Sequence, residues 1–237
     1  MKDERQRGAK DHVVLLHGLA RTRRSLWRIE HALKREGYQV LNLAYPSRSA
    51  PVSHIVSDWL EPALDRMRIA SGERVHFVTH SLGGIVFRAW ACRRRATFPL
   101  GRAVLMAPPN AGSDIVEHYG HLRWLRFALG PAVDDLKISG NCFAGTLGPP
   151  PPETGVIMGD HARIPLFRHL LGDRSDGIVT VDGGMLEGLA GFQVLPVDHT
   201  FMMWRSCVVR AVITFLRSGS FTDGVGQSGN TAQQRQD

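Results

Sequence analysis

The chain has 237 residues, of which 43% are hydrophobic and 22% charged; these values suit one soluble globular domain with a large core and exclude a disordered or fibrous protein. Its 29 lysines and arginines outnumber its 22 aspartates and glutamates, which gives a net charge of +7. Nucleic acid is still not an expected partner, because the basic residues come with neither interleaved aromatics nor a recognisable binding module.

The two ends of the chain differ in composition from its middle. Residues 1–11 form a polar extension without the apolar core of a signal peptide, and no apolar run approaches a membrane span, so we expect a cytoplasmic location. Residues 218–237 are mostly small and polar and predict a disordered tail. Cys92, Cys142 and Cys207 form no Cys-x-x-Cys pair, which argues against a disulfide framework and a zinc site.

The first elements alternate between strand and helix. Apolar residues 13–16 predict a buried strand that ends at His17-Gly18-Leu19. A helix follows, for which Ser25 is the expected cap and Gly37 the expected stop signal. Residues 38–44 then predict a second strand.

A second helical pattern runs from Ile55 to Met67, and Pro62 inside it predicts either a kink or the true start of the helix. After a further strand and helix, residues 103–107 predict a fourth buried strand that ends before Pro108. This alternation predicts an α/β fold with a doubly wound, mostly parallel sheet and helices on both faces. In such a sheet the loops that carry chemistry follow the carboxyl ends of the strands.

Residues 75–86 are predicted to be a strand that delivers a serine to a helix. Val, Phe and Val make a strand buried on both faces, and Gly83 lets the following helix pack close to it. The turn leaves the Ser81 hydroxyl exposed, while the backbone N–H of Leu82 and the helix dipole favour negative charge developing beside it. Ser81 is therefore the expected nucleophile.

The segment His80-Ser81-Leu82-Gly83-Gly84 resembles the nucleophile elbow of the α/β-hydrolase superfamily and is similar to that of bacterial lipases and carboxylesterases. Thr79 departs from the pattern, because the family carries a glycine there. The His-Gly loop after the first strand resembles the family's loop that supplies the second oxyanion-hole donor. The resemblance implies that the backbone amides of Leu19 and Leu82 form this hole, and that His17 shapes the loop.

Residues 110–153 break the regular alternation of strands and helices. Residues 121–129 within them carry an apolar helical stripe that includes Leu122 and Leu125. In position the segment corresponds to the family's insertion over the active site, which implies a small lid that lines an acyl pocket. The alternative is an ordinary amphipathic helix packed on the core.

A strand over residues 155–159 leads to a loop in which the resemblance requires a carboxylate. The segment Asp-Gly-Ile-Val-Thr that begins at Asp176 resembles the acid loop of bacterial lipases. Asp176 is therefore the expected acid, and Asp173 and Asp160 are the alternatives.

The last predicted strand, residues 192–197, runs into Asp198 and His199, and a terminal helix follows through Trp204 and Leu216. The superfamily carries its base in the loop after the final strand, so the resemblance implies that His199 is the general base. Asp198 is adjacent to His199 in sequence, which places its side chain poorly for orienting the imidazole.

The resemblance covers residues 12–217 and implies a serine hydrolase that cleaves carboxylic esters through Ser81, Asp176 and His199. The alternatives are an acyltransferase or a thioesterase on the same triad, and a catalytically silent hydrolase fold that acts as a binding module. No cofactor or metal is required. The expected partner is a small-molecule ester or lipid, with transient contact with lipid surfaces.

Arginines gather in two places. Arg21, Arg23, Arg24 and Arg28 follow the His-Gly loop, where they favour an anionic substrate or an anionic membrane surface, or simply form a solvated face. The run 93–95 falls at the end of the helix after Ser81, where cations complement the helix dipole.

Overall fold

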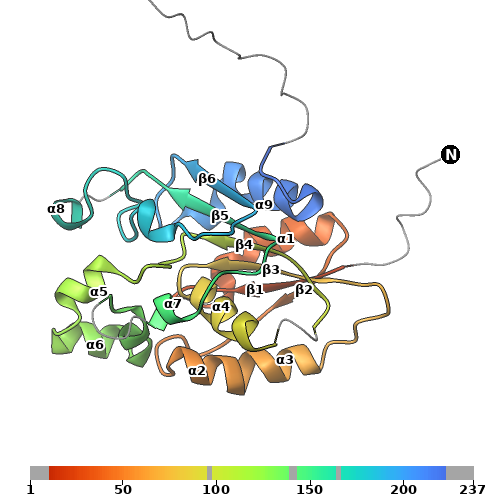
Figure 1. Cartoon of the computed structure of the whole chain (residues 1–237), viewed down its shortest axis with the longest axis horizontal. Coiled ribbons are helices and arrows are strands. Elements are labelled where there is room, and N and C mark those ends of the chain that lie inside the picture. Colours follow the sequence, from red (N-terminus) through yellow and green to blue (C-terminus); the bar gives the residue numbers. More distant parts are fainter. Residues whose placement is uncertain (1–10, 95–97, 139–142, 164–166, 223–237) are drawn as a thin grey trace, which may run out of the picture.

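A computed structural model describes residues 11–94, 98–138, 143–163 and 167–222. Six parallel strands form one sheet in the order β2-β1-β3-β4-β5-β6 (Figure 1). The strands are β1 (His12–Leu16), β2 (Gln39–Asn42), β3 (Val75–His80), β4 (Leu100–Met106), β5 (Thr154–Gly159) and β6 (Gly191–Leu195). The predicted α/β fold with a doubly wound parallel sheet is confirmed.

Helices cover both faces of the sheet (Figure 1). One face carries α1 (Trp27–Arg35) and α9 (Ser206–Ser218), and the other carries α2 (Val52–His54), α3 (Glu61–Asp65) and α4 (Leu82–Arg94). Beyond the carboxyl ends of the strands lie α5 (Asp114–Tyr119), α6 (Arg123–Leu129), α7 (Phe143–Thr146) and α8 (Arg168–Leu171). Within the described ranges, no helix has the length and apolar character needed to cross a membrane.

Segments of 3₁₀ or π helix connect these elements. They are η1 (Arg23–Leu26), the π-helical η2 (Ile55–Leu60), η4 (Pro131–Leu136), η6 (Asp182–Gly184) and η7 (Met202–Trp204).

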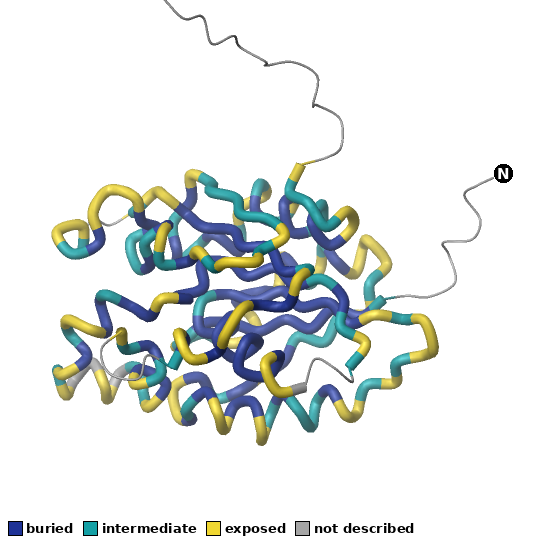
Figure 2. Tube along the Cα trace, in the orientation of Figure 1, coloured by how far each residue is buried: buried dark blue, intermediate teal, exposed yellow. Residues whose placement is uncertain are grey.

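The core lies along the middle of the sheet, where the tube in Figure 2 is buried almost throughout. Every residue of β1, β3 and β5 is buried, because helices cover both of their faces, whereas the edge strands β2 and β6 are mostly half-buried. Phe77 of β3 packs against Phe87 and Trp90 of α4, with ring centroids 4.8 and 5.0 Å away. This contact joins the strand before Ser81 to the helix that follows it.

The strand order reverses at β1, and a crevice for a site is expected at such a reversal. The chain leaves β1 for β2 on one side and later returns to β3 on the other side. In an open parallel sheet, the loops at such a reversal diverge and leave a crevice at the carboxyl ends of the strands. The His17-Gly18 loop after β1 and Ser81 after β3 meet at this crevice.

Two sequence expectations about helix ends are wrong. Ser25 does not cap a helix: it lies inside η1, its Oγ donates to the carbonyl of Thr22 at 2.8 Å, and Leu26 occupies the N-cap of α1. Trp204 does not lie in the terminal helix, since it ends the separate turn η7, and α9 begins at Ser206. In both places a 3₁₀ turn precedes the helix, which periodicity alone does not distinguish from a first α-helical turn.

Pro62 lies in the first turn of α3. This agrees with the expectation that Pro62 marks the true start of a helix. Helical backbone nevertheless runs on through η2 directly into α3, because η2 has the wider π geometry. A proline lacks an N–H and its ring clashes with the carbonyl four residues earlier. The wider turn just before Pro62 relieves that conflict without breaking the helical path.

Within the predicted insertion at residues 110–153, the described chain forms short helices. Ser113 caps α5 by accepting the N–H of Val116 at 3.4 Å. The side chain of Phe127 on α6 is 89% exposed, while Leu129 packs against the core. Other members of the expected stripe, Leu125 and Ala128, fall outside the described side chains. The lid therefore stays a prediction.

The predicted terminal segments fall mainly outside the described residues, as do Cys142 and Arg95. At the C-terminal side the described chain continues past α9, and the ring of Phe221 packs on Phe215 with centroids 4.6 Å apart. The extent of the hydrolase domain, given above as residues 12–217, also stays a prediction.

We expect Phe77→Ala to lower the free energy of unfolding by about 3–5 kcal/mol, because Phe77 is wholly buried and the cavity left by its ring cannot be refilled. Urea unfolding followed by circular dichroism measures the change. Phe127→Ala is the control, since truncating this exposed ring should change stability by less than about 0.5 kcal/mol. Equal effects of the two substitutions would contradict the packing described here.

Candidate active site

Ser81 occupies the turn between β3 and α4. Its φ of 52° lies in the left-handed region, which is unusual for a residue with a side chain. The surrounding backbone holds it there: the N–H of Ser81 donates to the carbonyl of Met106 at 2.9 Å, and its own carbonyl accepts the N–H of Gly84 at 2.8 Å. Such a strained strand-to-helix turn is the geometry that exposes a nucleophilic hydroxyl.

Two glycines allow the segments around Ser81 to come this close. A Cβ at Gly83 would lie 2.4 Å from the carbonyl oxygen of Leu16, so only a glycine lets the first turn of α4 pack on the end of β1. A Cβ at Gly18 would lie 2.8 Å from Nδ1 of His80 and 3.2 Å from Cβ of Ser81. The loop after β1 is therefore pressed directly against the elbow.

Thr79, which stands where the family pattern has a glycine, is wholly buried in the structure. A Cβ at Gly84 would lie 3.4 Å from Oγ1 of Thr79, an ordinary contact distance, but only 2.9 Å from Cβ of Pro108. The second glycine of the His-Ser-Leu-Gly-Gly segment thus allows the close approach of Pro108.

The His17-Gly18-Leu19 loop is held by a residue that sequence reasoning missed. The hydroxyl of Tyr45 donates to the carbonyl of His17, and the two rings stack with centroids 4.0 Å apart. Burial raises the pKa of Tyr45 and lowers that of His17, so both rings stay neutral. The loop-shaping role expected for His17 agrees with this packing.

The expected oxyanion donors belong to the two segments that meet at Ser81. Leu82 opens α4, so its N–H precedes the first intrahelical hydrogen bonds, and Leu19 lies in the loop that Gly18 presses against the elbow. Within the described residues, neither backbone amide has a hydrogen-bond acceptor. Both are available to a ligand oxygen at this place.

Asp176 and His199 form a buried hydrogen-bonded pair. Nδ1 of His199 lies 2.7 Å from Oδ2 of Asp176, whose side chain is wholly buried. Oδ1 of Asp176 accepts the backbone N–H groups of Ile178 at 3.0 Å and Val179 at 2.7 Å. The backbone N–H of His199 also donates to the carbonyl of Asp176 at 3.0 Å, so the two loops are joined twice.

The other aspartates weighed from the sequence lie elsewhere. Asp173 is exposed and pairs with Arg168 at 2.6 Å, and Asp160 is exposed just after β5. Asp198 caps its own loop by accepting the N–H groups of Thr200 and Phe201, each at 3.0 Å. Of these carboxylates only Asp176 contacts the His199 ring in the described part of the chain.

His80 connects the elbow to the His199 loop, a role that the sequence analysis did not recognise. Its Nε2 lies 3.0 Å from the carbonyl of His199, and the two rings have centroids 4.9 Å apart. This contact requires Nε2 to carry the proton, which leaves Nδ1 as an acceptor that faces Gly18 without a partner. Its position directly before Ser81 was the only available signal.

These contacts bring Ser81, His199, Asp176 and the two expected donors to one end of the sheet. In the described residues no hydrogen bond joins the Ser81 hydroxyl to His199, so the link between them runs through His80. Asp176 and His199 are joined directly.

A cavity of about 300 Å³ opens between the Asp176 loop and the His199 loop. Its lining combines aromatic and aliphatic side chains with one arginine and two aspartates. The lining residues are Arg163, Phe167, Asp176, Gly177, Ile178, Asp198, Thr200 and Phe201.

Comparison with protein families gives a match over residues 13–217 to the alpha/beta hydrolase family. The chain belongs to this family. The match spans β1 to α9, and hence every element of this hydrolase that was described above as part of the site. Comparison with curated protein sequences gives no match.

Several solved structures share the fold of this alpha/beta hydrolase. Mature lipase BlEst2 from Bacillus licheniformis has a TM-score of 0.64 at 18% identity, over 83% of this chain and 87% of that one. The metagenomic carboxyl esterase MGS0156 has a TM-score of 0.64 at 18% identity, over 81% and 65% of the chains. Phospholipase PlaB from Legionella pneumophila has 0.57 at 19% identity, over 75% and 45%.

Buried histidines predict how the stability of this hydrolase depends on pH. Burial, and to a lesser extent the neighbouring His199, lowers the pKa of His80 well below its ordinary value, and burial also lowers the pKa of His17 and His76. In the unfolded chain these rings bind protons near about pH 6.5, while in the fold they stay neutral. The unfolded state therefore binds more protons, and the free energy of unfolding falls as the pH drops below about 6.5.

We expect His80→Gln to make this loss of stability at acid pH shallower, because glutamine keeps an N–H donor but cannot bind a proton. Urea unfolding at about pH 7.5 and about pH 5.5, on either side of the unfolded pKa, measures the difference. The control is His31→Gln, since His31 is exposed and its loss should leave the difference as in the wild type. The same pH dependence in all three proteins would show that His80 is not responsible.

Proposed function

We propose that this alpha/beta hydrolase cleaves carboxylic esters by nucleophilic catalysis at Ser81. The observation that carries the proposal is the buried pair of Asp176 and His199, joined at 2.7 Å and tied through His80 to the strained turn at Ser81. A nucleophile, a base and a carboxylate that orients the base form the set that a Ser-His-Asp triad uses for acyl transfer to serine. The fold alone would not support this step.

In the proposed reaction, Nε2 of His199 takes the proton of the Ser81 hydroxyl as the oxygen attacks the ester carbonyl. Asp176 holds the tautomer in which Nδ1 carries the proton and stabilises the imidazolium that forms. The two backbone N–H groups on Ile178 and Val179 keep Asp176 aimed at the ring. Hydrogen bonds between nucleophile and base often tighten only when substrate is bound, so the free Ser81 hydroxyl is compatible with this role.

The negative oxygen of the tetrahedral intermediate would be bound by the backbone amides of Leu19 and Leu82. Leu82 directly follows Ser81, Leu19 follows Gly18 in the loop that packs on Ser81, and neither amide has an acceptor in the described chain; the positive end of the α4 dipole would add to the stabilisation. His199 then protonates the leaving alcohol, and a water activated by the same ring releases the acyl group from Ser81.

The choice of an ester as substrate rests on two supports. The structural relatives named above are a lipase, a carboxyl esterase and a phospholipase, although their identity to this chain is below 20%. The cavity beside the Asp176 and His199 loops has an apolar side formed by Phe167, Ile178 and Phe201, which suits the hydrocarbon part of an ester.

We expect Ser81→Ala to lower kcat for p-nitrophenyl acetate or butyrate by about 10⁴-fold or more, because it removes the attacking oxygen. Ser53→Ala is the control, since Ser53 is exposed on α2. A fluorophosphonate probe should label the wild type and not Ser81→Ala. Labelling without ester turnover would point to acyl transfer to another acceptor, and a wild type that is neither labelled nor active would overturn the proposal.

The aspartate is tested by matched substitutions. Asp176→Asn should lower kcat by about 10⁴-fold, because an asparagine stabilises the wrong histidine tautomer and cannot stabilise the imidazolium. Asp173→Asn and Asp160→Asn should keep the activity of the wild type, since neither carboxylate contacts His199. Loss of activity in either control, with Asp176→Asn active, would reassign the acid.

A further inference from the structure

A group of exposed arginines surrounds an exposed tryptophan at one side of the sheet's carboxyl end. Trp27 is 57% exposed at the start of α1. The arginines lie before it in η1, after it in α1, on the segment that follows β5, and before α9. We call the group the basic rim; it consists of Trp27, Arg23, Arg24, Arg28, Arg163 and Arg205, all of them exposed.

Hydrogen bonds connect the segments that carry the basic rim. Arg28 donates to the carbonyl of Trp204 at 2.7 Å and to Oγ of Ser206 at 3.0 Å, which brings Arg205 beside it. The indole of Trp204 donates in turn to the carbonyl of Ser25 at 2.8 Å. The start of α1 is thus fixed to the chain that follows His199.

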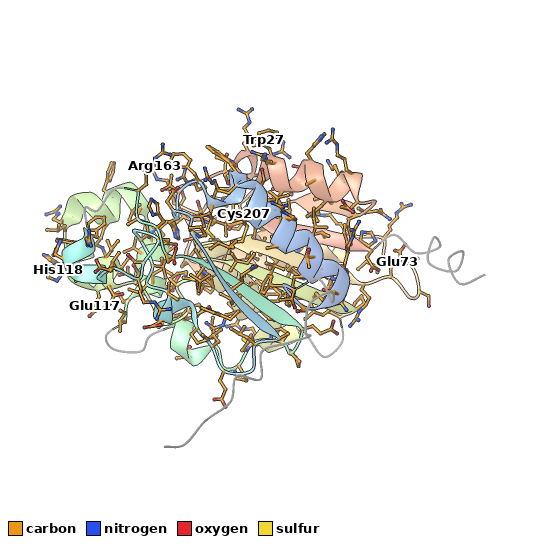
Figure 3. The ribbon with its side chains drawn as sticks, turned by 90° about the horizontal axis from the view of Figure 1, so that it is seen from above. Trp27, Glu73, Glu117, His118, Arg163 and Cys207 are labelled. Atoms are coloured by element: carbon orange, nitrogen blue, oxygen red, sulfur yellow. The ribbon has the colours of Figure 1, made fainter. Side chains whose placement is uncertain are left out.

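From Trp204 the surface continues to the cavity. The ring of Trp204 packs against Phe201 with centroids 5.4 Å apart, and the guanidinium of Arg163 lies over the face of Phe201 at 5.2 Å. Phe201 and Arg163 both line the 300 Å³ cavity between the Asp176 and His199 loops. In Figure 3, Trp27 and Arg163 project from the same margin of the molecule.

The basic rim keeps an excess of positive charge. In the described part of the chain, none of its five arginines lies within 4.0 Å of a carboxylate, whereas Arg74, Arg126 and Arg168 elsewhere on the surface do. The nearest acid in sequence, Glu30, is hydrogen-bonded to Asn42 and Lys34, and it also lies close enough to Arg23 to interact with its charge. Asp198, in the wall of the cavity, is occupied by two backbone N–H groups.

We propose that the basic rim docks this protein on an anionic phospholipid surface, with the cavity opening at the line of contact. Guanidinium groups bind phosphate oxygens through two parallel hydrogen bonds, and an indole ring prefers the boundary between headgroups and acyl chains. An exposed tryptophan among unpaired arginines combines both requirements. Single-stranded nucleic acid is less well matched, because it needs a row of aromatic platforms and the rim has only one exposed ring.

Docking is a binding property and stands apart from the proposed catalysis. It is therefore measured with the full chain carrying Ser81→Ala, which prevents hydrolysis of the lipid. Co-sedimentation is compared between vesicles of phosphatidylcholine alone and vesicles that also contain phosphatidylglycerol. Binding to the anionic vesicles, weakened by added salt, is the expected result.

Two further substitutions locate the contact. Each arginine near an anionic surface raises the binding constant about fivefold, so Arg23→Gln with Arg24→Gln should weaken vesicle binding by about tenfold or more. Arg66→Gln with Arg68→Gln is the matched control: both residues are exposed, but they follow α3 near the amino-terminal ends of the strands. Trp27→Ala should also weaken binding.

In a protein that keeps Ser81, the double variant Arg23→Gln with Arg24→Gln should turn over p-nitrophenyl acetate as fast as the wild type. This result would show that the candidate site is intact. The proposal is overturned if anionic vesicles bind no better than neutral ones, or if the Arg66 and Arg68 pair loses as much binding as the Arg23 and Arg24 pair. It is also overturned if the rim substitutions abolish binding to a DNA oligonucleotide and leave vesicle binding unchanged.

Discussion

The site depends on the close approach of the first turn of α4 to the end of β1. Gly83 permits it, because any side chain there would overlap the carbonyl of Leu16. The packing of Phe77 of β3 on Phe87 and Trp90 of α4 holds the helix against the sheet. Ser81 is thereby kept at a φ of 52°, a strain of about 1–3 kcal/mol that the surrounding core can balance. Without this contact the serine would relax into an ordinary turn.

Around the elbow, loops from distant parts of the sequence are joined mainly through backbone groups. The amide of His199 donates to Asp176, the carboxylate of Asp176 accepts two amides, and His80 reaches the carbonyl of His199. Backbone partners do not depend on side-chain rotamers, so the geometry is preorganised before a substrate arrives. The cost is a set of buried neutral histidines, which makes the same region sensitive to acid.

The surface arginines differ in whether they pair with a carboxylate. Several surface arginines are paired with carboxylates, but in the described chain those of the basic rim form no such pair, and one of them, Arg163, lines the cavity that adjoins the Asp176 and His199 loops. A cationic surface next to such an opening raises the local concentration of anionic molecules. Part of the excess of basic residues in the sequence therefore lies at the end of the sheet where the candidate site lies.

The sequence by itself determined the order of strands and helices, the serine at the elbow and the histidine after the last strand, because buried periodicity and short motifs are encoded by neighbouring residues. Only the tertiary structure decided which aspartate contacts His199, how closely Gly84 packs on Pro108, and that Tyr45 and His80 support the loops. Each of these contacts joins side chains to groups made neighbours by the fold. Local patterns do not record such distances, just as they did not reveal the 3₁₀ turn around Ser25 or the π turn before Pro62.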